Sequence, residues 1–233
     1  MDSLRLGWES SPVSEPLQTD EQVATPPGRA RRRRARRGEG PALREEILQA
    51  AERLLIETGD QEAVSIRAVA QAVGVTPPSI YLHFADKNDL VFAVCERAFA
   101  RFDAVQEEAA AQSDDPLESL MLRGRAYVRF GLENPEQYRI LFMTRPSGTP
   151  HSWTPETIAG IAAFWHLVEA VQRCMDAGAL TQGDPVVYAI GCWSSVHGIT
   201  SLLLSHPQFP WPEHEELIDH ILLAPIEGLR PKG

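Results

Sequence analysis

The segment VTPPSIYLHFADK, residues 75–87, gathers side chains that are suited to contact phosphate groups. Thr76, Tyr81, His83 and Lys87 carry a hydroxyl, a phenol, an imidazole and an ammonium group. All of these groups donate hydrogen bonds to phosphate oxygens. Each residue alone also fits an ordinary place in a core, a turn or the solvent. The four together, around one short segment, predict a phosphate-binding surface.

Two adjacent prolines, Pro77 and Pro78, stand at the start of this segment. The first amides of a helix have no acceptor within the helix, so proline costs no helical hydrogen bond there. We expect Thr76 to be the N-cap and its hydroxyl to accept a hydrogen bond from the amide of Ser79. The rigid proline rings would then lie against thymine methyl groups in a DNA major groove.

The neighbouring helices must position this segment. Ser65 precedes IRAVAQAV as a predicted N-cap, and Gly74 follows it as a residue that tolerates positive φ. Two short helices joined by such a turn are typical of a helix-turn-helix. Asp86 and Asp89 open a long helix downstream. An amphipathic helix ending at Gly59 is predicted upstream from apolar residues at helical spacing. These are Leu43, Ile47, Ala50, Ala51, Leu54 and Leu55.

The remainder of the chain also reads as helical, with candidate ranges 117–133, 135–143, 155–177, 184–205 and 213–229. Pro225 lies inside the last range, so we expect that helix to be kinked or to end early. The predicted fold class is all-α. No apolar run reaches the ~18–20 residues that span a bilayer, and no secretory signal is recognised. We therefore expect a cytoplasmic protein without membrane contact.

The charge is distributed unevenly along the chain. The formal net charge is -10, yet the stretch RARRRRARR over 29–37 contains seven arginines, including Arg31, Arg32, Arg33 and Arg34. Residues 1–40 are rich in Pro, Ser, Glu, Gly and Arg, which predicts disorder. A basic arm on an acidic body suggests an anionic partner, which the arm would contact in a minor groove or along phosphates. A solubilising tail is the alternative.

Residues 43–90 resemble the DNA-binding domain of the tetracycline-repressor (TetR) family of bacterial transcriptional regulators. The resemblance rests on ILQAAERLLIETG, SIRAVAQAVGVTPPSIYLHF and DKNDL in this order and spacing. It implies an N-terminal three-helix helix-turn-helix DNA-binding domain over 41–88, after the tail over 1–40. A helical domain over 89–233 would bind an effector and form the dimer.

The resemblance also implies which residues contact DNA. The phosphate-contacting positions are those of Thr76, Tyr81, His83 and Lys87. Pro77, Pro78 and Ser79 would present the recognition helix to the bases, and Ser65 and Arg67 would approach DNA from the preceding helix. Pro78 departs from the small residue that many family members have there, which puts the base contacts at this position in doubt.

The C-terminal part resembles a domain type named for a Trp-His-Gly signature. NPEQYRILFM and GCWSSVHGITSLLL carry this likeness, with Trp193, His197 and Gly198 as the signature residues. Trp193 and His197 are four apart and therefore share a helix face. Gly198 inside a helix costs about 1 kcal/mol relative to alanine, which suggests close packing or a bend.

Aromatic and apolar residues are abundant in this domain, and some could line a ligand pocket instead of the core. The predicted ligand contacts are Tyr127, Phe130, Phe142, Met143, Trp165, Trp193 and His197. His166 or His197 could orient a ligand, and an apolar or aromatic effector is expected. The last two helices would supply the dimer interface through Ile190, Leu203, Leu204, Leu217, Ile221 and Leu222.

The resulting prediction is a homodimeric regulator, most simply a repressor that a small effector releases from a palindromic operator in double-stranded DNA. No cofactor or metal is called for. Cys95, Cys174 and Cys192 are too far apart for a thiolate site and read as buried side chains. No G-x-S-x-G elbow or glycine-rich phosphate loop indicates an enzyme. A nonspecific nucleoid-type DNA binder and a transcriptional activator remain as alternatives.

Overall fold

The computed structural model describes residues 40–143 and 158–231, all within the unit Arg31–Gly233. These two ranges contain nine α-helices, one short 3-10 helix and no strand, which confirms the predicted all-α class. The predicted disordered tail, its arginines 31–34, and the first residues of the helix expected over 155–177 lie outside the described ranges.

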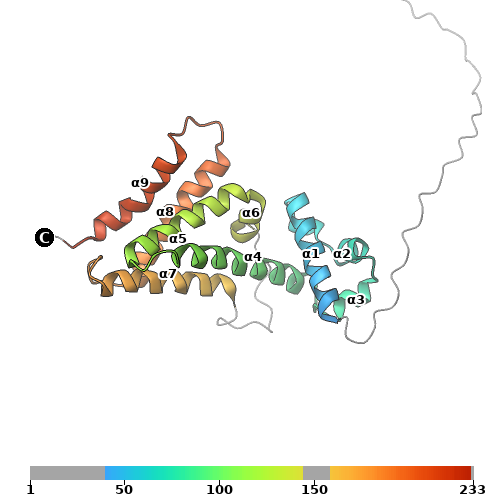
Figure 1. The fold of residues 1–233 in the computed structure, drawn as a ribbon. Coiled ribbons are helices and arrows are strands. Elements are labelled where there is room, and N and C mark those ends of the chain that lie inside the picture. Colours follow the sequence, from blue (N-terminus) through green and yellow to red (C-terminus); the bar gives the residue numbers. More distant parts are fainter. Residues whose placement is uncertain (1–39, 144–157, 232–233) are drawn as a thin grey trace, which may run out of the picture. The chain divides into compact units, whose positions relative to one another are not determined.

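The N-terminal helices follow the predicted order (Figure 1). They are α1 (Gly40–Thr58), η1 (Gln61–Ala63), α2 (Ile66–Val73), α3 (Pro77–Tyr81) and α4 (Lys87–Ala110). The Ser65 side chain accepts a hydrogen bond from the Ala68 amide at 3.1 Å and caps α2, as expected. Gly74 ends α2 with φ at 78°, a left-handed conformation that favours glycine.

Two aspartates set the start of α4. The Asp86 carboxylate accepts from the Asp89 amide at 2.8 Å, and the Asp89 carboxylate accepts in turn from the Ala85 amide at 2.9 Å. The first bond satisfies an amide that the first turn would leave without an acceptor, and the second satisfies the amide of the residue before the N-cap. Helix α4 therefore begins with its own side-chain caps, after the connection 82–86 that follows α3.

The helix-turn-helix packs on a small apolar core and is joined to α4 by ion pairs. Ile47, Val69 and Ile80 are fully buried in this core. On its other side, α1 presents carboxylates to α4: Arg97 pairs with Glu45 at 2.5 Å and with Glu52 at 3.2 Å. These contacts attach α1 to the first half of α4.

The C-terminal helices are α5 (Pro116–Glu133), α6 (Pro135–Met143), α7 (Ala159–Asp176), α8 (Pro185–Ser205) and α9 (His214–Leu229). Helix α9 continues through Pro225 to Leu229, so the expected early end is wrong. The proline ring removes one backbone donor, but apolar residues on either side of it, Leu222 and Ile226, remain buried.

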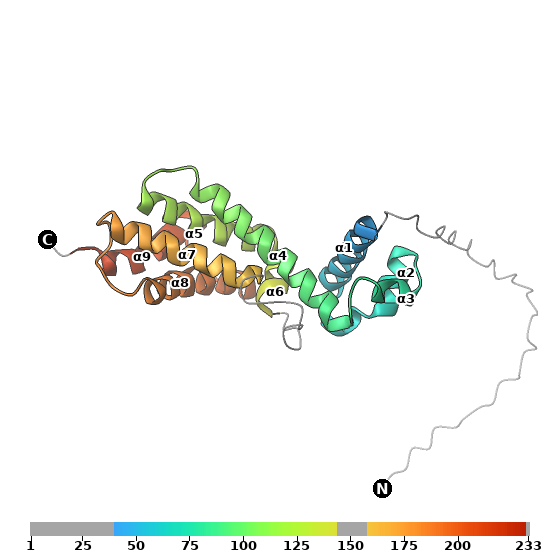
Figure 2. The same cartoon turned by 90° about the horizontal axis from the view of Figure 1, so that it is seen from below.

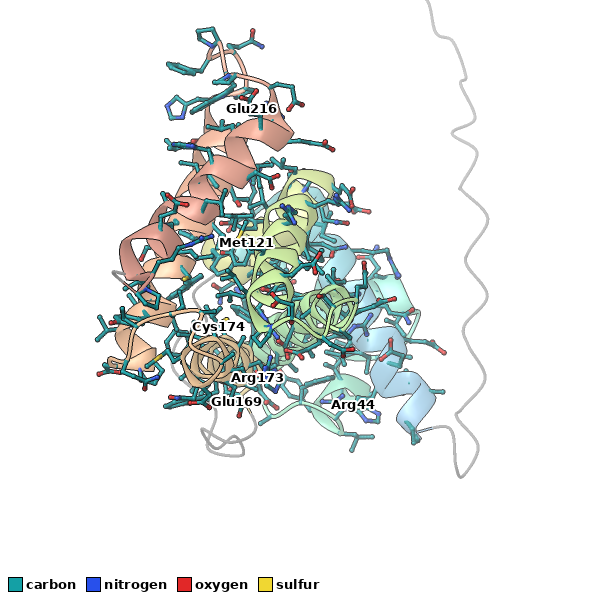
Figure 3. The ribbon with its side chains drawn as sticks, turned by 60° about the vertical axis from the view of Figure 1, so that its left-hand side comes forward. Arg44, Met121, Glu169, Arg173, Cys174 and Glu216 are labelled. Atoms are coloured by element: carbon teal, nitrogen blue, oxygen red, sulfur yellow. The ribbon has the colours of Figure 1, made fainter. Side chains whose placement is uncertain are left out.

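Helix α4 is the common element of the two parts. It packs against α1 as well as α5, α6 and α7, while α5 and α7 both contact α8 (Figure 2). The predicted domain boundary after residue 88 falls inside the first turn of α4, which continues unbroken across it. Helix α7 turns Cys174 into the bundle and exposes Glu169 and Arg173 (Figure 3).

Helix α8 departs from two expectations. It contains no charged side chain, and it is long and apolar enough to cross a membrane by length and composition, contrary to the sequence-based prediction. This is weak support for a membrane span, because His197 and Thr200 make hydrogen bonds inside the protein. Close packing at Gly198 is also wrong within the described chain: an added Cβ would meet no atom within 4 Å.

One face of α8 is apolar and exposed. Val187, Ile190 and Leu202 are 58%, 46% and 48% exposed. By contrast Leu203 and Leu222, both expected at a dimer interface, are buried within the chain. The reason is helical phase: Leu203 faces the other helices of the bundle, and its neighbour Leu202 faces away from them.

Candidate nucleic-acid interface and ligand cavity

The N-terminal end of α3 has the predicted prolines but not the predicted cap. Thr76 is the N-cap residue, and Pro77 and Pro78 occupy the first two helical positions. The Thr76 hydroxyl does not accept from the Ser79 amide; it lies 3.2 Å from the Ser79 hydroxyl. The amide of Ser79 instead donates to the Thr76 carbonyl at 2.9 Å. This hydroxyl pair is a local alternative that the sequence pattern did not distinguish.

The residues predicted to contact DNA differ in their exposure to solvent. Thr76, Pro78, Tyr81 and Arg67 are exposed. Four others are half-buried: Pro77, Ser79, His83 and Lys87. The Ser65 hydroxyl is engaged in capping α2 and keeps only its remaining hydrogen-bonding capacity for another partner.

Leu82 is a candidate contact that the sequence analysis missed. It follows α3 directly and is 82% exposed, more than any other large hydrophobic side chain in the described ranges. The neighbouring Ile80 and Phe84 are buried, so the backbone turn leaves Leu82 pointing outward beside Tyr81. The available signal in the sequence was an apolar residue within a run of hydrogen-bond donors.

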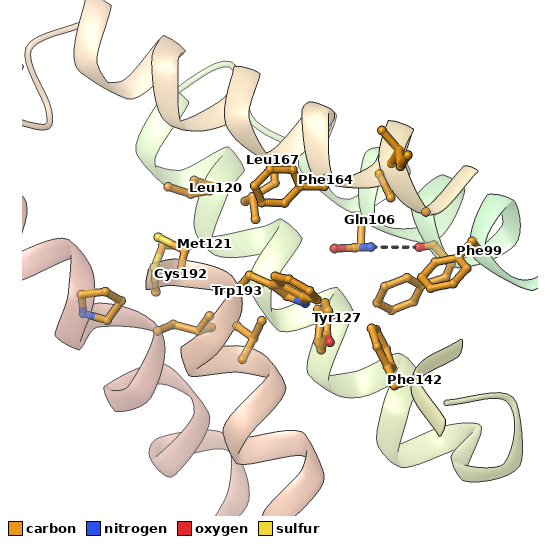
Figure 4. A pocket seen from close by; sticks show the side chains of 18 of the residues that line it. Phe99, Gln106, Leu120, Met121, Tyr127, Phe142, Phe164, Leu167, Cys192 and Trp193 are labelled. Carbon is orange, nitrogen blue, oxygen red and sulfur yellow. Dashed lines mark hydrogen bonds between the residues drawn. The ribbon is translucent and has the colours of Figure 1, made fainter. Parts of the chain in front are cut away.

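A cavity of about 320 Å³ lies in the C-terminal part, between α4, α5, α6, α7, α8 and α9 (Figure 4). This volume is within the usual range of ~300–1,000 Å³ for small-molecule sites. Aromatic rings form much of the wall, with Phe99 and Phe142 edge to face at 5.8 Å and Phe164 and Trp193 at 6.1 Å between centroids. The wall is apolar enough to bind hydrophobic molecules.

Three of the seven predicted ligand contacts line this cavity: Tyr127, Phe142 and Trp193. Phe130 is buried against Phe102, and Trp165 is half exposed on the outer side of α7, so neither reaches it. His197 also lies outside the lining. The side chain of Met143 is outside the part of the chain that the structure describes.

His197 belongs to a hydrogen-bonded cluster behind the Tyr127 side of the cavity. Its Nδ1 lies 2.8 Å from the Tyr138 hydroxyl and 3.0 Å from the Tyr127 hydroxyl. Burial lowers the pKa of His197 and raises the pKa values of both tyrosines, so all three groups are neutral near pH 7. The cluster occupies the polar end of Tyr127 and leaves its ring to the cavity.

Two nine-tenths-buried polar side chains of α4, Glu96 and Gln106, line the cavity. The Glu96 carboxylate accepts the backbone N–H of Ala159, and burial raises the pKa of this carboxyl group. Cys192 is a third polar group of the wall, and burial raises the pKa of its thiol to about 11, which keeps it protonated. Among the described lining residues, none is Lys, Arg or His.

His166 is engaged outside the cavity. Its Nδ1 lies 2.8 Å from the Asp103 carboxylate and 3.6 Å from that of Glu107. The ligand atoms of these three residues all lie within 4.8 Å of one another and could hold a metal ion. Glu107 also pairs with the buried Arg123, whose positive charge opposes a cation there. His166 therefore does not orient a ligand in this cavity.

Comparisons with known proteins match both parts of the chain. Residues 47–94 match the model for bacterial regulatory proteins of the tetR family, and residues 120–224 match the model for the tetracyclin repressor-like C-terminal domain. An uncharacterized HTH-type transcriptional regulator of Mycobacterium tuberculosis is 30% identical over 169 residues, covering 71% of this chain and 69% of the relative. The chain belongs to the TetR family.

Solved structures agree with the TetR fold. A protein of unknown function from Rhodococcus sp. RHA1 aligns with a TM-score of 0.67 at 25% identity, covering 81% of this chain and 96% of that one. SmeT, the repressor of the Stenotrophomonas maltophilia multidrug efflux pump SmeDEF, aligns with a TM-score of 0.61 at 21% identity, covering 84% and 94%. This TetR-family chain is therefore a DNA-binding transcription regulator, with its helix-turn-helix in α2 and α3.

Proposed function

We propose that this TetR-family regulator is a homodimeric repressor that an apolar or aromatic effector releases from a palindromic operator. The observation that carries the proposal is the course of α4. The helix starts at Lys87, and only residues 82–86 separate it from the end of the recognition helix at Tyr81. Farther along, it lines the cavity with Phe99, Phe102 and Gln106. One rigid element thus touches both the DNA-binding unit and the ligand cavity.

In this proposal α3 enters the major groove. The exposed ring of Pro78 and the exposed Leu82 side chain contact thymine methyl groups and sugars, while the hydroxyls of Thr76 and Tyr81 donate to phosphates. Arg67, exposed on α2, neutralises a further phosphate. The buried Ile80 keeps the helix seated on its core.

The arginine arm adds affinity more than specificity. Its last arginine, Arg37, lies three residues before Gly40, where α1 begins. His83 approaches that same start of α1, since an added Cβ on Gly40 would lie 4.0 Å from the His83 ring. The arm therefore joins the folded chain next to the proposed DNA-contacting residues, and its charges would interact with the phosphate backbone.

A second copy covers the exposed face of α8. Val187, Ile190 and Leu202 would pack across a two-fold axis, and Gly198 would let the helices approach closely. Exposed apolar patches of this kind mark interfaces. A dimer also matches a palindromic operator, because each recognition helix reads one half-site.

The effector acts through its preference for one of two arrangements of α4. A ligand that binds the cavity better in the form that does not match the operator shifts the population toward that form. Repression is favoured over activation by the likeness to SmeT, which is itself a repressor. A DNA-binding regulator of this family works in the cytoplasm, and its chemistry is binding without catalysis.

The test is selection of random duplex DNA by the purified full-length protein at near-physiological salt. Pro78→Ala and a variant with Arg31–Arg34 replaced by glutamine are selected in parallel. We expect a palindromic motif from the wild type and from the glutamine variant, the latter with a smaller dependence on salt. The Pro78 variant should change base preference at a position within each half-site.

Retention that depends wholly on the arginines, without a recovered motif, would identify a nonspecific DNA binder. If the protein binds the operator equally tightly with and without a saturating cavity ligand, the effector mechanism is refuted. A recovered operator placed before a reporter gene gives the sign of regulation directly.

A further inference from the structure

The amide of Gln106 is held in one orientation by its neighbour. Its Nε2 donates to the backbone carbonyl of Phe102 at 3.2 Å. A carbonyl oxygen can only accept, so the amide nitrogen must face Phe102 and Oε1 must face the other way. Figure 4 shows Gln106 with its oxygen turned away from that hydrogen bond, into the cavity on the side of Phe164 and Trp193.

The Gln106 oxygen has no hydrogen-bond donor among the described residues. The side chain is 7% exposed and lies within an apolar wall, where an acceptor without a donor is unfavourable. Among the donors of the lining, the Tyr127 hydroxyl is engaged with His197. This oxygen is therefore open to a donor on a molecule that enters the cavity.

The charge of the wall restricts the partner further. Glu96 is ten residues before Gln106, about 15 Å along α4. It places a carboxyl group at the other end of the same wall. With no Lys, Arg or His among the described lining residues, an anionic ligand would lose its hydration and find no cation.

We propose that this cavity selects apolar or aromatic molecules bearing an uncharged hydrogen-bond donor, a hydroxyl or amide N–H, which donates to Gln106 Oε1. The same cavity rejects carboxylates of the same size. This inference rests on the proposed function only in taking the cavity as the effector site; it specifies the chemistry of the effector.

The test uses three probes with one skeleton: 2-naphthol, 2-methoxynaphthalene and 2-naphthoate. On the same ring system they present a donor, a methylated oxygen without a donor, or a negative charge. Calorimetric titration of the full chain, without DNA, should show 2-naphthol binding about five- to tenfold tighter than 2-methoxynaphthalene, as expected for one hydrogen bond. The naphthoate should bind weakest of the three.

Gln106→Met removes the acceptor at nearly constant side-chain length. We expect the preference for 2-naphthol over 2-methoxynaphthalene to disappear in it, through loss of naphthol affinity alone. Gln112→Met, at an exposed position just beyond the end of α4, is the matched control and should keep the preference. Gln106→Leu also lacks the acceptor and should lose the preference in the same way, which covers the case in which the methionine variant does not fold.

The proposal is overturned by equal affinities of the wild type for the first two probes, by a preference that survives Gln106→Met, by naphthoate binding as tightly as naphthol, or by no binding of any probe. Its failure is separable from failure of the proposed function. A chain that binds a palindromic operator but does not discriminate the probes loses only this inference. If the chain discriminates the probes but selects no DNA motif, only the proposed repressor function is refuted.

Discussion

The helix-turn-helix draws its candidate DNA contacts from one stretch, 65–87, whereas the cavity collects residues from Glu96 to Ile226. In the first region short helices, caps and turns expose neighbouring side chains together. In the second, helices distant in sequence must pack before any wall exists. The first arrangement is encoded locally and the second by tertiary contacts, so they should respond differently to substitution.

The largest expected effect distinguishes a buried core residue of the helix-turn-helix from an exposed candidate DNA contact. Ile80→Ala removes a fully buried side chain and should lower the free energy of unfolding by ~2–5 kcal/mol. Leu82→Ala, two residues later and 82% exposed, should change it by less than about 0.5 kcal/mol. Urea unfolding followed by circular dichroism measures both. Equal losses would mean that Leu82 is part of the core and not a DNA contact.

The next effect concerns the polar cluster behind the cavity. His197→Phe leaves the buried hydroxyls of Tyr127 and Tyr138 without their shared partner and should cost ~1–3 kcal/mol. The exposed His206, changed to Phe, serves as the control. Thermal unfolding ranks the two variants, and an equal cost would show that the cluster contributes nothing specific.

The same variant should change the dependence of stability on pH. Burial lowers the pKa of His197 in the folded protein below its ordinary 6.5. Its stabilising contribution is therefore fully present above pH 6.5 and is lost as the pH falls through the lowered value. His197→Phe should lack this loss. If wild type and variant lost the same stability as the pH falls, the pH dependence would come from groups other than His197.

A smaller effect compares two glycines inside helices. An added Cβ at Gly131 would lie 2.4 Å from the Thr200 methyl group, whereas one at Gly198 meets nothing within 4 Å. Gly198→Ala should therefore gain about 1 kcal/mol of stability in the isolated chain from helix propensity. In Gly131→Ala overpacking offsets that gain. Ultracentrifugation of Gly198→Ala also tests the α8 face, because a close dimer contact there would be weakened.

The smallest effect is expected at Glu96. Burial raises the pKa of this carboxyl group above its ordinary 4.5, so its stabilising contribution is fully present below pH 4.5 and is lost as the pH rises through the raised value. Glu96→Gln should therefore become progressively more stable than the wild type as the pH rises toward neutrality. Melting temperatures of both proteins across this pH range test this prediction. A difference in melting temperature that does not change with pH would contradict it.

The capped helices were predictable because each depends on a few adjacent residues. Ser65, Asp86 and Gly74 act as predicted, since a side chain and an amide three residues away need no tertiary contact to meet. The Thr76 cap was wrong for an equally local reason, because the Ser79 hydroxyl competes for the same oxygen. Local sequence patterns thus predict where a helix begins more reliably than they predict the hydrogen-bond partner of a capping hydroxyl.

The cavity was only partly predictable. Trp165 and Trp193 both stand on apolar helices, yet only Trp193 lines the cavity, because the packing of α7 against α8 decides which face turns inward. Gln106 carried no sequence signal at all: a glutamine on a long helix is ordinarily solvated, and its burial depends on α5 and α7. The family resemblance predicted the type of domain but not which residues line its cavity.

The length of α4 gives it the properties of a lever. Nineteen residues separate Gln106 from Lys87, a span of about 28 Å at 1.5 Å per residue. A rotation of only about 5° at the cavity end displaces the other end by about 2.5 Å over this arm length. Hydrogen-bond distances vary by only about 0.5 Å, so a ligand need change very little beside Gln106 to misalign contacts at the far end. The unbroken helix converts a small local adjustment into a large linear displacement.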